Sequence, residues 1–97
     1  MTKVKTKRWD PAEHLATKEA AAAYLKAAIE DGDPALIVAV LGDIARSRGM
    51  GQVAKDAQLT RASLYKSLRA ESKPEFATIL KVMGALGVKL KVEGIVT

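Results

Sequence analysis

Hydrophobic positions recur with a helical period along most of the chain. Between Thr17, which can cap a helix N-terminus, and Gly32, which can end a helix, apolar residues fall three or four positions apart. Asp33-Pro34 then begins a second predicted helix, because Asp caps N-termini and Pro is tolerated at the first helical position; this helix ends before Gly49. The apolar stripes are Ala21, Leu25, Ala28 and Ile29 in the first helix, and Ile37, Val40, Leu41, Ile44 and Ala45 in the second.

Three further helices are predicted, over Met50–Ala57, Arg61–Leu68 and Pro74–Leu86. Thr60 is the expected cap of the middle helix, whereas Gly51 stands where a Ser or Thr cap would be expected for the first. The last helix is expected to bury Phe76, Ile79, Leu80, Met83 and Leu86, and Gly87 ends it.

The pattern changes after Gly87. Apolar Val88, Leu90 and Val92 alternate with charged residues, which is typical of a half-buried β-strand over 88–93. The expected fold class is therefore all-α, with five helices and a short C-terminal β-strand.

A chain of 97 residues makes one domain with a modest core. Residues 1–8 are basic and lack an apolar pattern, so we expect a flexible N-terminus followed by a single domain over 9–97. No apolar run approaches the roughly 20 residues that span a bilayer, and no apolar segment follows the basic N-terminus as in a signal peptide. We expect a cytoplasmic protein without membrane contact.

Catalytic and metal-site chemistry finds little support. The chain has no cysteine and one histidine, His14, which has no second histidine to complete a metal site. No serine lies in a nucleophile motif, and no Gly-rich phosphate loop follows a strand. We therefore expect no enzyme activity, no metal and no cofactor.

The net charge of +5 is unevenly distributed. Basic residues dominate from Arg46 to Lys73, whereas acidic residues dominate from Asp10 to Asp33. The first stretch suits a polyanion such as nucleic acid, although two solvated faces of opposite sign would give the same pattern.

The segment from Gln52 to Leu68 has the features of a helix-turn-helix. This motif needs a small contact between two short helices and one apolar residue buried by the turn, and Ala54 and Leu59 suit these two roles. Val53, Ala57, Leu64 and Leu68 are the expected inward residues. The outward residues of the second helix are short, polar or cationic and could enter a major groove; they are Arg61, Ala62, Ser63, Lys66, Ser67 and Arg69. The alternative is an ordinary helical hairpin with polar outer residues.

Residues 49–88 resemble the Cro/phage-repressor (XRE) class of helix-turn-helix domains, with the motif itself at about 50–68. A narrower resemblance, covering about residues 9–92, is to the addiction-module antidote family of HigA-like antitoxins. The segments that carry it are Asp31-Gly-Asp-Pro, Leu41-Gly-Asp-Ile-Ala-Arg, Arg48-Gly-Met, Ser63-Leu-Tyr-Lys and Phe76-Ala-Thr-Ile-Leu-Lys-Val. Position 58 departs from the motif, because its turn usually has Gly there and this chain has Gln. We therefore expect a left-handed backbone at Gln58.

The resemblance implies roles for residues of the segment. Arg61, Ala62 and Lys66 match the positions that contact base edges in this class. Gln52, Thr60 and Ser63 match positions that usually hold phosphate. Lys55, Arg69 and Lys73 are assigned to phosphate on charge alone, and for each the alternative is a solvated surface residue.

By the same resemblance, the chain is expected to bind an operator in double-stranded DNA, repress its own operon and bind a RelE-like ribonuclease toxin. The acidic N-terminal third, with Trp9 as an aromatic anchor, is one candidate surface for the toxin; the alternative is that Trp9 packs on the first helix. A prophage-type repressor without a toxin partner and an interaction module without DNA binding are the other functions open to this sequence.

A homodimer is expected for two reasons. A lone strand over 88–93 lacks a pairing partner, so a second copy could supply one, and we expect Met83, Val88, Leu90 and Val92 at that interface. Two recognition helices also contact two DNA half-sites, about 34 Å or a multiple of that apart. The alternative is that residues 88–97 form a frayed tail.

Overall fold

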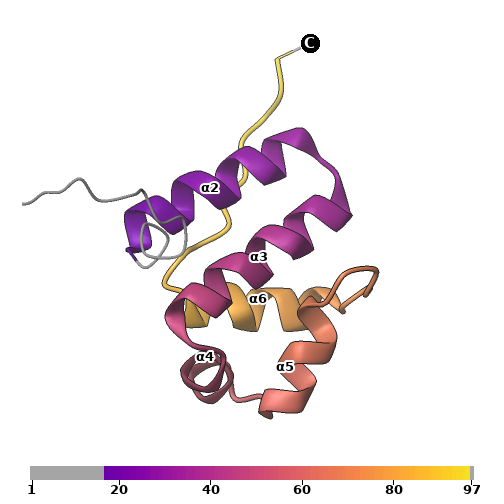
Figure 1. Ribbon diagram of the computed structural model, residues 1–97. Helices are drawn as coiled ribbons and strands as arrows, with labels where there is room; N and C mark the ends of the chain where they lie inside the picture. The colour runs from indigo at the N-terminus through magenta and orange to yellow at the C-terminus, as the bar shows by residue number, and fades with distance from the viewer. Residues whose placement is uncertain (1–16, 97) are drawn as a thin grey trace, which may run out of the picture.

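The computed structural model describes residues 17–96, in which five helices surround a shared core (Figure 1). The helices are α2 (Lys18–Asp31), α3 (Pro34–Arg48), α4 (Met50–Ala57), α5 (Arg61–Leu68) and α6 (Phe76–Ala85). These bounds confirm the first four predicted helices, and the fifth is shorter than the predicted Pro74–Leu86. The expectations for the basic residues 1–8, for Trp9 and for His14 fall outside the described residues.

Local capping explains where α2 and α3 begin and end. The Thr17 hydroxyl accepts a hydrogen bond from the Ala20 N–H at 3.1 Å, and the Asp33 carboxylate accepts one from the Ala35 N–H at 3.0 Å. Between them, Gly32 has a φ of 85°, the left-handed geometry that ends many helices. The tight connection makes α2 and α3 neighbours in a helical hairpin (Figure 1).

A single residue, Gly49, joins α3 to α4. Its φ of 100° lies in a region that L side chains rarely adopt, and its N–H donates to the Ala45 carbonyl at 2.9 Å. The expected cap position was wrong, because Gly49 directly precedes α4 and Gly51 lies inside the helix. A glycine is required by the backbone here, so this helix begins without a side-chain cap.

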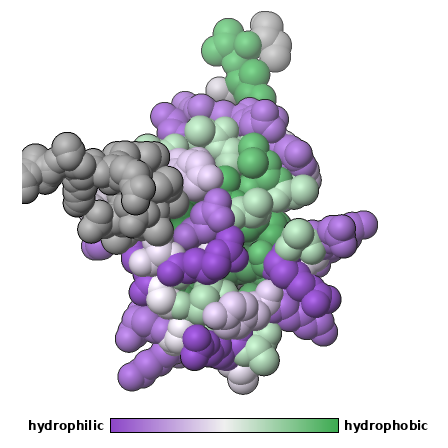
Figure 2. All heavy atoms as spheres, viewed as in Figure 1, coloured by the Kyte–Doolittle hydropathy of each residue, from purple (hydrophilic) through white to green (hydrophobic). Residues whose placement is uncertain are grey.

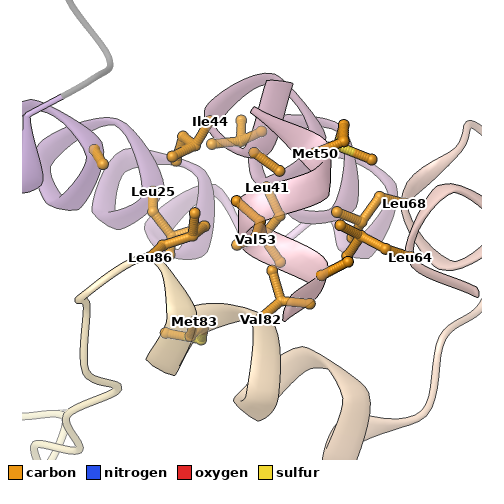
Figure 3. Packing of buried hydrophobic residues seen from close by; sticks show 14 of the residues in the cluster. Leu25, Leu41, Ile44, Met50, Val53, Leu64, Leu68, Val82, Met83 and Leu86 are labelled. Atoms are coloured by element: carbon orange, nitrogen blue, oxygen red, sulfur yellow. The ribbon is translucent and has the colours of Figure 1, made fainter. Parts of the chain in front are cut away.

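The core forms where all five helices converge. Val53 of α4 points into its centre, between Leu41 of α3 and Val82 of α6 (Figure 3). Leu64 and Leu68 enter from α5 on one side and Leu25 enters from α2 on the other. The predicted apolar stripes of α2 and α3 are confirmed, with Ile29 and Ile37 partly buried at their edges.

Helix α6 buries a narrower stripe than predicted. It begins at Phe76 and not at Pro74, and Phe76 is 63% exposed and Leu80 44% exposed. The stripe that faces α4 follows Val82, Met83 and Leu86. At 100° per residue, Phe76 and Leu80 fall on the flank of that stripe. Another element would have to pack against this flank of α6 to bury them as well.

The described residues contain no β-strand, which corrects the prediction for 88–93. Gly87 has a φ of 79° and the Val88 N–H donates to the Met83 carbonyl at 3.0 Å, so α6 ends in a Schellman motif. Beyond Val88 the chain leaves the core, and Val92 is 92% exposed. The alternating pattern was not sufficient, because a strand forms only beside a segment that accepts its backbone hydrogen bonds, and residues 17–87 are folded into helices and turns.

Candidate nucleic-acid interface

A Schellman motif closes the turn between α4 and α5. Gln58 has φ 61° and ψ 42°, which confirms the left-handed backbone expected at this position. The Leu59 N–H donates to the Ala54 carbonyl at 2.8 Å, and the Gln58 N–H donates to the Lys55 carbonyl at 3.1 Å. This pair of hydrogen bonds fixes the direction in which the chain leaves α4.

Apolar contacts hold the two short helices at the core. Ala54 is 3% exposed, and its small side chain lets neighbouring elements approach α4 closely. Leu59, in the turn, is half-buried and packs against the core, as predicted. Figure 1 shows α4 and α5 as neighbours at one end of the molecule, with α5 crossing the direction of α4.

One face of α5 is anchored and the remainder is exposed. Leu64 is fully buried and Leu68 is 3% exposed, so replacing Leu64 by Ala would cost roughly 2–5 kcal/mol of stability. At the other end, the Thr60 hydroxyl accepts a hydrogen bond from the Ser63 N–H at 3.0 Å, which confirms the predicted cap. The helix is therefore fixed along its length while its outer side chains face solvent.

Every residue predicted to contact DNA is exposed. Arg61, Ala62 and Lys66, predicted at base edges, all lie on α5. The predicted phosphate contacts are more widely spread, with Gln52 and Lys55 on α4, Thr60 and Ser63 at the start of α5, Arg69 at its end and Lys73 in the following loop. The structure thus brings the two helices' polar side chains to one end of the molecule but leaves Lys73 outside both helices.

Two of the predicted phosphate contacts have a partner within the chain. The Gln52 amide nitrogen donates to the Asp56 carboxylate at 2.9 Å, one helical turn further along α4. A primary amide has two N–H donors, so one is left for an outside acceptor. The Thr60 oxygen accepts from Ser63 and keeps its own hydroxyl hydrogen for donation. Both side chains can therefore hold a phosphate oxygen without breaking these contacts.

Sequence reasoning missed Tyr65. It lies on α5 with 45% of its surface exposed, and the Arg61 guanidinium carbon stands 5.8 Å from the centre of its ring. An aromatic residue did not fit the criterion of short, polar or cationic outward side chains. Its spacing of four from Arg61 is the signal that could have found it, since such pairs share a helix face.

The electrostatics of this end of the molecule favour an anion. The exposed cations of α4, α5 and the loop after them are Lys55, Arg61, Lys66, Arg69 and Lys73. Asp56, Glu71 and Glu75 are the acidic residues in that part of the chain. Figure 2 shows mostly hydrophilic atoms over the α4–α5 end and an apolar strip nearer the middle of the same face. A polyanion would meet a positive, well-hydrated surface here.

The predicted dimer residues occupy two different environments. Met83 is 4% exposed and belongs to this chain's own core, and Val88 packs partly against that core. Leu90 is 38% exposed and Val92 92% exposed. Of the four, Leu90 and Val92 thus have the surface that a second copy could contact.

Residues 17–96 provide neither a cluster of metal ligands nor a helix suited to a membrane. No group of three or more His, Cys, Asp or Glu side chains is placed so as to hold a metal ion. None of the helices in this range is both long and apolar enough to cross a membrane.

Residues 5–94 match a family described as probable addiction module antidote protein. A Haemophilus influenzae protein, described only as uncharacterized, is 44% identical over 87 residues, which cover 90% of each chain. No solved structure matches the chain.

Proposed function

The chain belongs to the family of probable addiction module antidote proteins, and we propose that it is a DNA-binding antitoxin of a type II toxin–antitoxin module. In this proposal it binds its toxin and represses its own operon through a helix-turn-helix formed by α4 and α5. In this proposal the protein acts by binding and not by catalysis. It is also cytoplasmic, because the operon that it represses lies in the cytoplasm.

The geometry of α4 and α5 supports the DNA-binding part. Helix α5 is anchored by Leu64 and Leu68, its N-terminal turn carries Arg61 and Ala62, and the end of the molecule that it occupies is positive. A major groove about 12 Å wide admits one such helix. Arg61 would donate to guanine O6 and N7, and Ala62 would contact a thymine methyl group. This anchored helix with a polar, cationic outer face is the single observation that carries the proposal.

An antidote requires a toxin, and the surface charge suggests where it binds. Glu30 and Asp31 at the end of α2 and Asp33 in the following turn are all exposed. Figure 1 shows this turn at the opposite end of the molecule from α4 and α5. A basic, RelE-like ribonuclease would be attracted to this acidic turn, so one chain could hold toxin and operator together.

A homodimer completes the proposal. Residues 89–96 carry unpaired backbone and exposed apolar side chains, including Val92, Ile95 at 85% and Val96 at 99% exposure. Antiparallel pairing with a second copy about a two-fold axis would satisfy this segment and form the strand that one chain lacks. It would also present two α5 helices to successive half-sites, about 34 Å apart.

Co-expression with the product of the adjacent gene tests the antitoxin part. The two proteins should co-elute in size exclusion, and the double variant Glu30→Lys, Asp31→Lys should weaken the complex. The double variant Glu71→Lys, Glu75→Lys is the matched control, because it makes the same charge change at two exposed positions in the loop between α5 and α6, outside both the acidic turn and the proposed dimer segment. If the neighbour is not a small toxin, or if it elutes separately, the antitoxin reading fails and a repressor without a toxin partner remains.

A further inference from the structure

We propose that Tyr65 is a positioning residue for Arg61 and thereby sets base selectivity at one position of the operator. The inference rests on the proposed DNA-binding function and specifies a residue that the helix-turn-helix pattern does not assign. Its basis is the 5.8 Å separation between the Arg61 guanidinium carbon and the centre of the Tyr65 ring. That distance is within the range of a cation–π contact.

Helix geometry explains why these two side chains meet. Residues four apart on a helix lie on the same face, and a long side chain leans back over the preceding turn. Tyr65 therefore extends toward the N-terminal turn of α5, where Arg61 begins the helix. Leu64, the residue beside Tyr65, is fully buried, so the backbone that presents the ring is held firmly by the core.

The type of contact matters for base recognition. A carboxylate partner would occupy the N–H groups of the guanidinium, which are the groups that guanine needs. A ring offers its π-electrons and no carboxylate oxygens, so it leaves the guanidinium N–H groups available for guanine O6 and N7. Over residues 17–96 the ion pair present joins Arg46 to Asp43, and α5 contains no acidic residue. Tyr65 thus restrains Arg61 without competing for its donors.

Restraint before binding has a measurable value. A mobile arginine loses rotamer freedom when it docks on a base, whereas a guanidinium already held against a ring loses less. An exposed cation–π contact contributes roughly two- to five-fold in an equilibrium constant. Because the restraint acts through Arg61, this factor should fall on discrimination at the base that Arg61 contacts and not on general affinity for DNA.

The experiment uses the full chain and a preferred duplex selected from a random-sequence library. Affinity is measured for this duplex and for versions with each guanine replaced in turn. Tyr65→Leu should reduce discrimination at one guanine by roughly two- to five-fold, and Tyr65→Phe, which keeps the ring, should preserve it. In an Arg61→Ala background, Tyr65→Leu should change discrimination no further. Circular dichroism checks that the variants are folded. We expect them to be, because the replaced side chain of Tyr65 is exposed.

Three results would overturn the inference while leaving the proposed function intact. In the first, Tyr65→Leu weakens binding to all duplexes equally. In the second, Tyr65→Phe loses as much base discrimination as Tyr65→Leu. In the third, the losses of discrimination caused by Tyr65→Leu and Arg61→Ala are additive. A wild-type chain that selects no sequence at all would instead remove the DNA-binding function itself, and this inference with it.

Discussion

Gly42 of α3 lies against the carbonyl oxygen of Leu68, the last residue of α5. A β-carbon built at Gly42 would stand 3.2 Å from that oxygen and 3.2 Å from one terminal guanidinium nitrogen of Arg46. The end of the proposed recognition helix therefore rests on bare backbone of α3. Any side chain at position 42 would push on the element that we expect to enter DNA.

Gly42→Ala should consequently lower the free energy of unfolding. Alanine gains about 1 kcal/mol in helix propensity, but overpacking a tight contact typically costs 1–3 kcal/mol, and the Leu68 carbonyl is backbone that yields little. We expect a net loss of about 1 kcal/mol, measured by urea denaturation. Gly84→Ala is the matched control, because a β-carbon there meets nothing within 4 Å and should stabilise α6. Equal responses at the two glycines would contradict the close approach.

Gln58→Gly should stabilise the fold by about 1 kcal/mol, because glycine removes the penalty for a side chain at left-handed φ. Gln58→Val should act in the opposite direction, since a β-branched residue tolerates this geometry poorly. Thermal melts of the two variants give the comparison. A glycine variant that melts below the parent chain would indicate ordinary backbone geometry at position 58.

Tyr24 links α2 to α3 and should make stability depend on alkaline pH. Its hydroxyl donates to the Asp43 carboxylate at 3.1 Å, and burial, this hydrogen bond and the Asp43 charge together raise the pKa of Tyr24 above 10.0. The folded state thus retains the phenol proton more strongly than the unfolded state does. The contribution to stability is full below pH 10 and is lost as pH rises through the folded pKa.

Tyr24→Phe therefore tests the pH dependence directly. The free energy of unfolding of the variant should be lower by roughly 0.5–1.5 kcal/mol near neutral pH, as expected for the loss of one partly exposed hydrogen bond. Its free energy of unfolding should also fall less steeply with pH in the alkaline range. Chemical denaturation of both chains at pH 8 and above pH 10 measures the stability difference and its pH dependence. If stability falls equally steeply with alkaline pH in the variant, the pH dependence arises from groups other than Tyr24.

The C-terminal segment can be tested by shortening the chain after Val88, which keeps the residue that closes α6. Sedimentation should show a dimer for the intact chain at tens of micromolar and a monomer for the shortened chain. Val92→Pro should also weaken the dimer, because proline removes a backbone donor at a residue that is 92% exposed in one chain. A monomeric intact chain, or a dimer that survives truncation, would exclude this segment from an interface.

The sequence predicted the helices well because their signals are local. Thr17, Asp33 and Thr60 cap their helices as expected, and the left-handed turn at Gln58 followed from the motif register. Local signals could not establish whether 88–93 forms a strand, because a strand needs a second extended segment to accept its backbone hydrogen bonds. The exposure of Phe76 and Leu80 depends on which flank of α6 other helices cover, which their apolar character alone does not encode.

The candidate site was predicted in part for the same reason. Outward residues of α5 followed from periodicity around Leu64 and Leu68, and the structure leaves them exposed with the exception of Ser67, which is half-buried. The contact of Tyr65 with Arg61 and that of Gln52 with Asp56 depend on side-chain geometry. Sequence spacing permits both pairs but does not establish that they form.

The central claim, that α5 reads DNA sequence, is tested most directly by comparing Arg61→Ala with Lys55→Ala on a selected duplex and on a random one. Arg61→Ala should weaken the binding free energy for the selected duplex by about 1–3 kcal/mol and reduce the base preference at one position of the site. Lys55→Ala should weaken both duplexes alike and reduce the slope of log affinity against log salt by about one unit. Equal losses on both duplexes for Arg61→Ala would contradict base recognition by this helix.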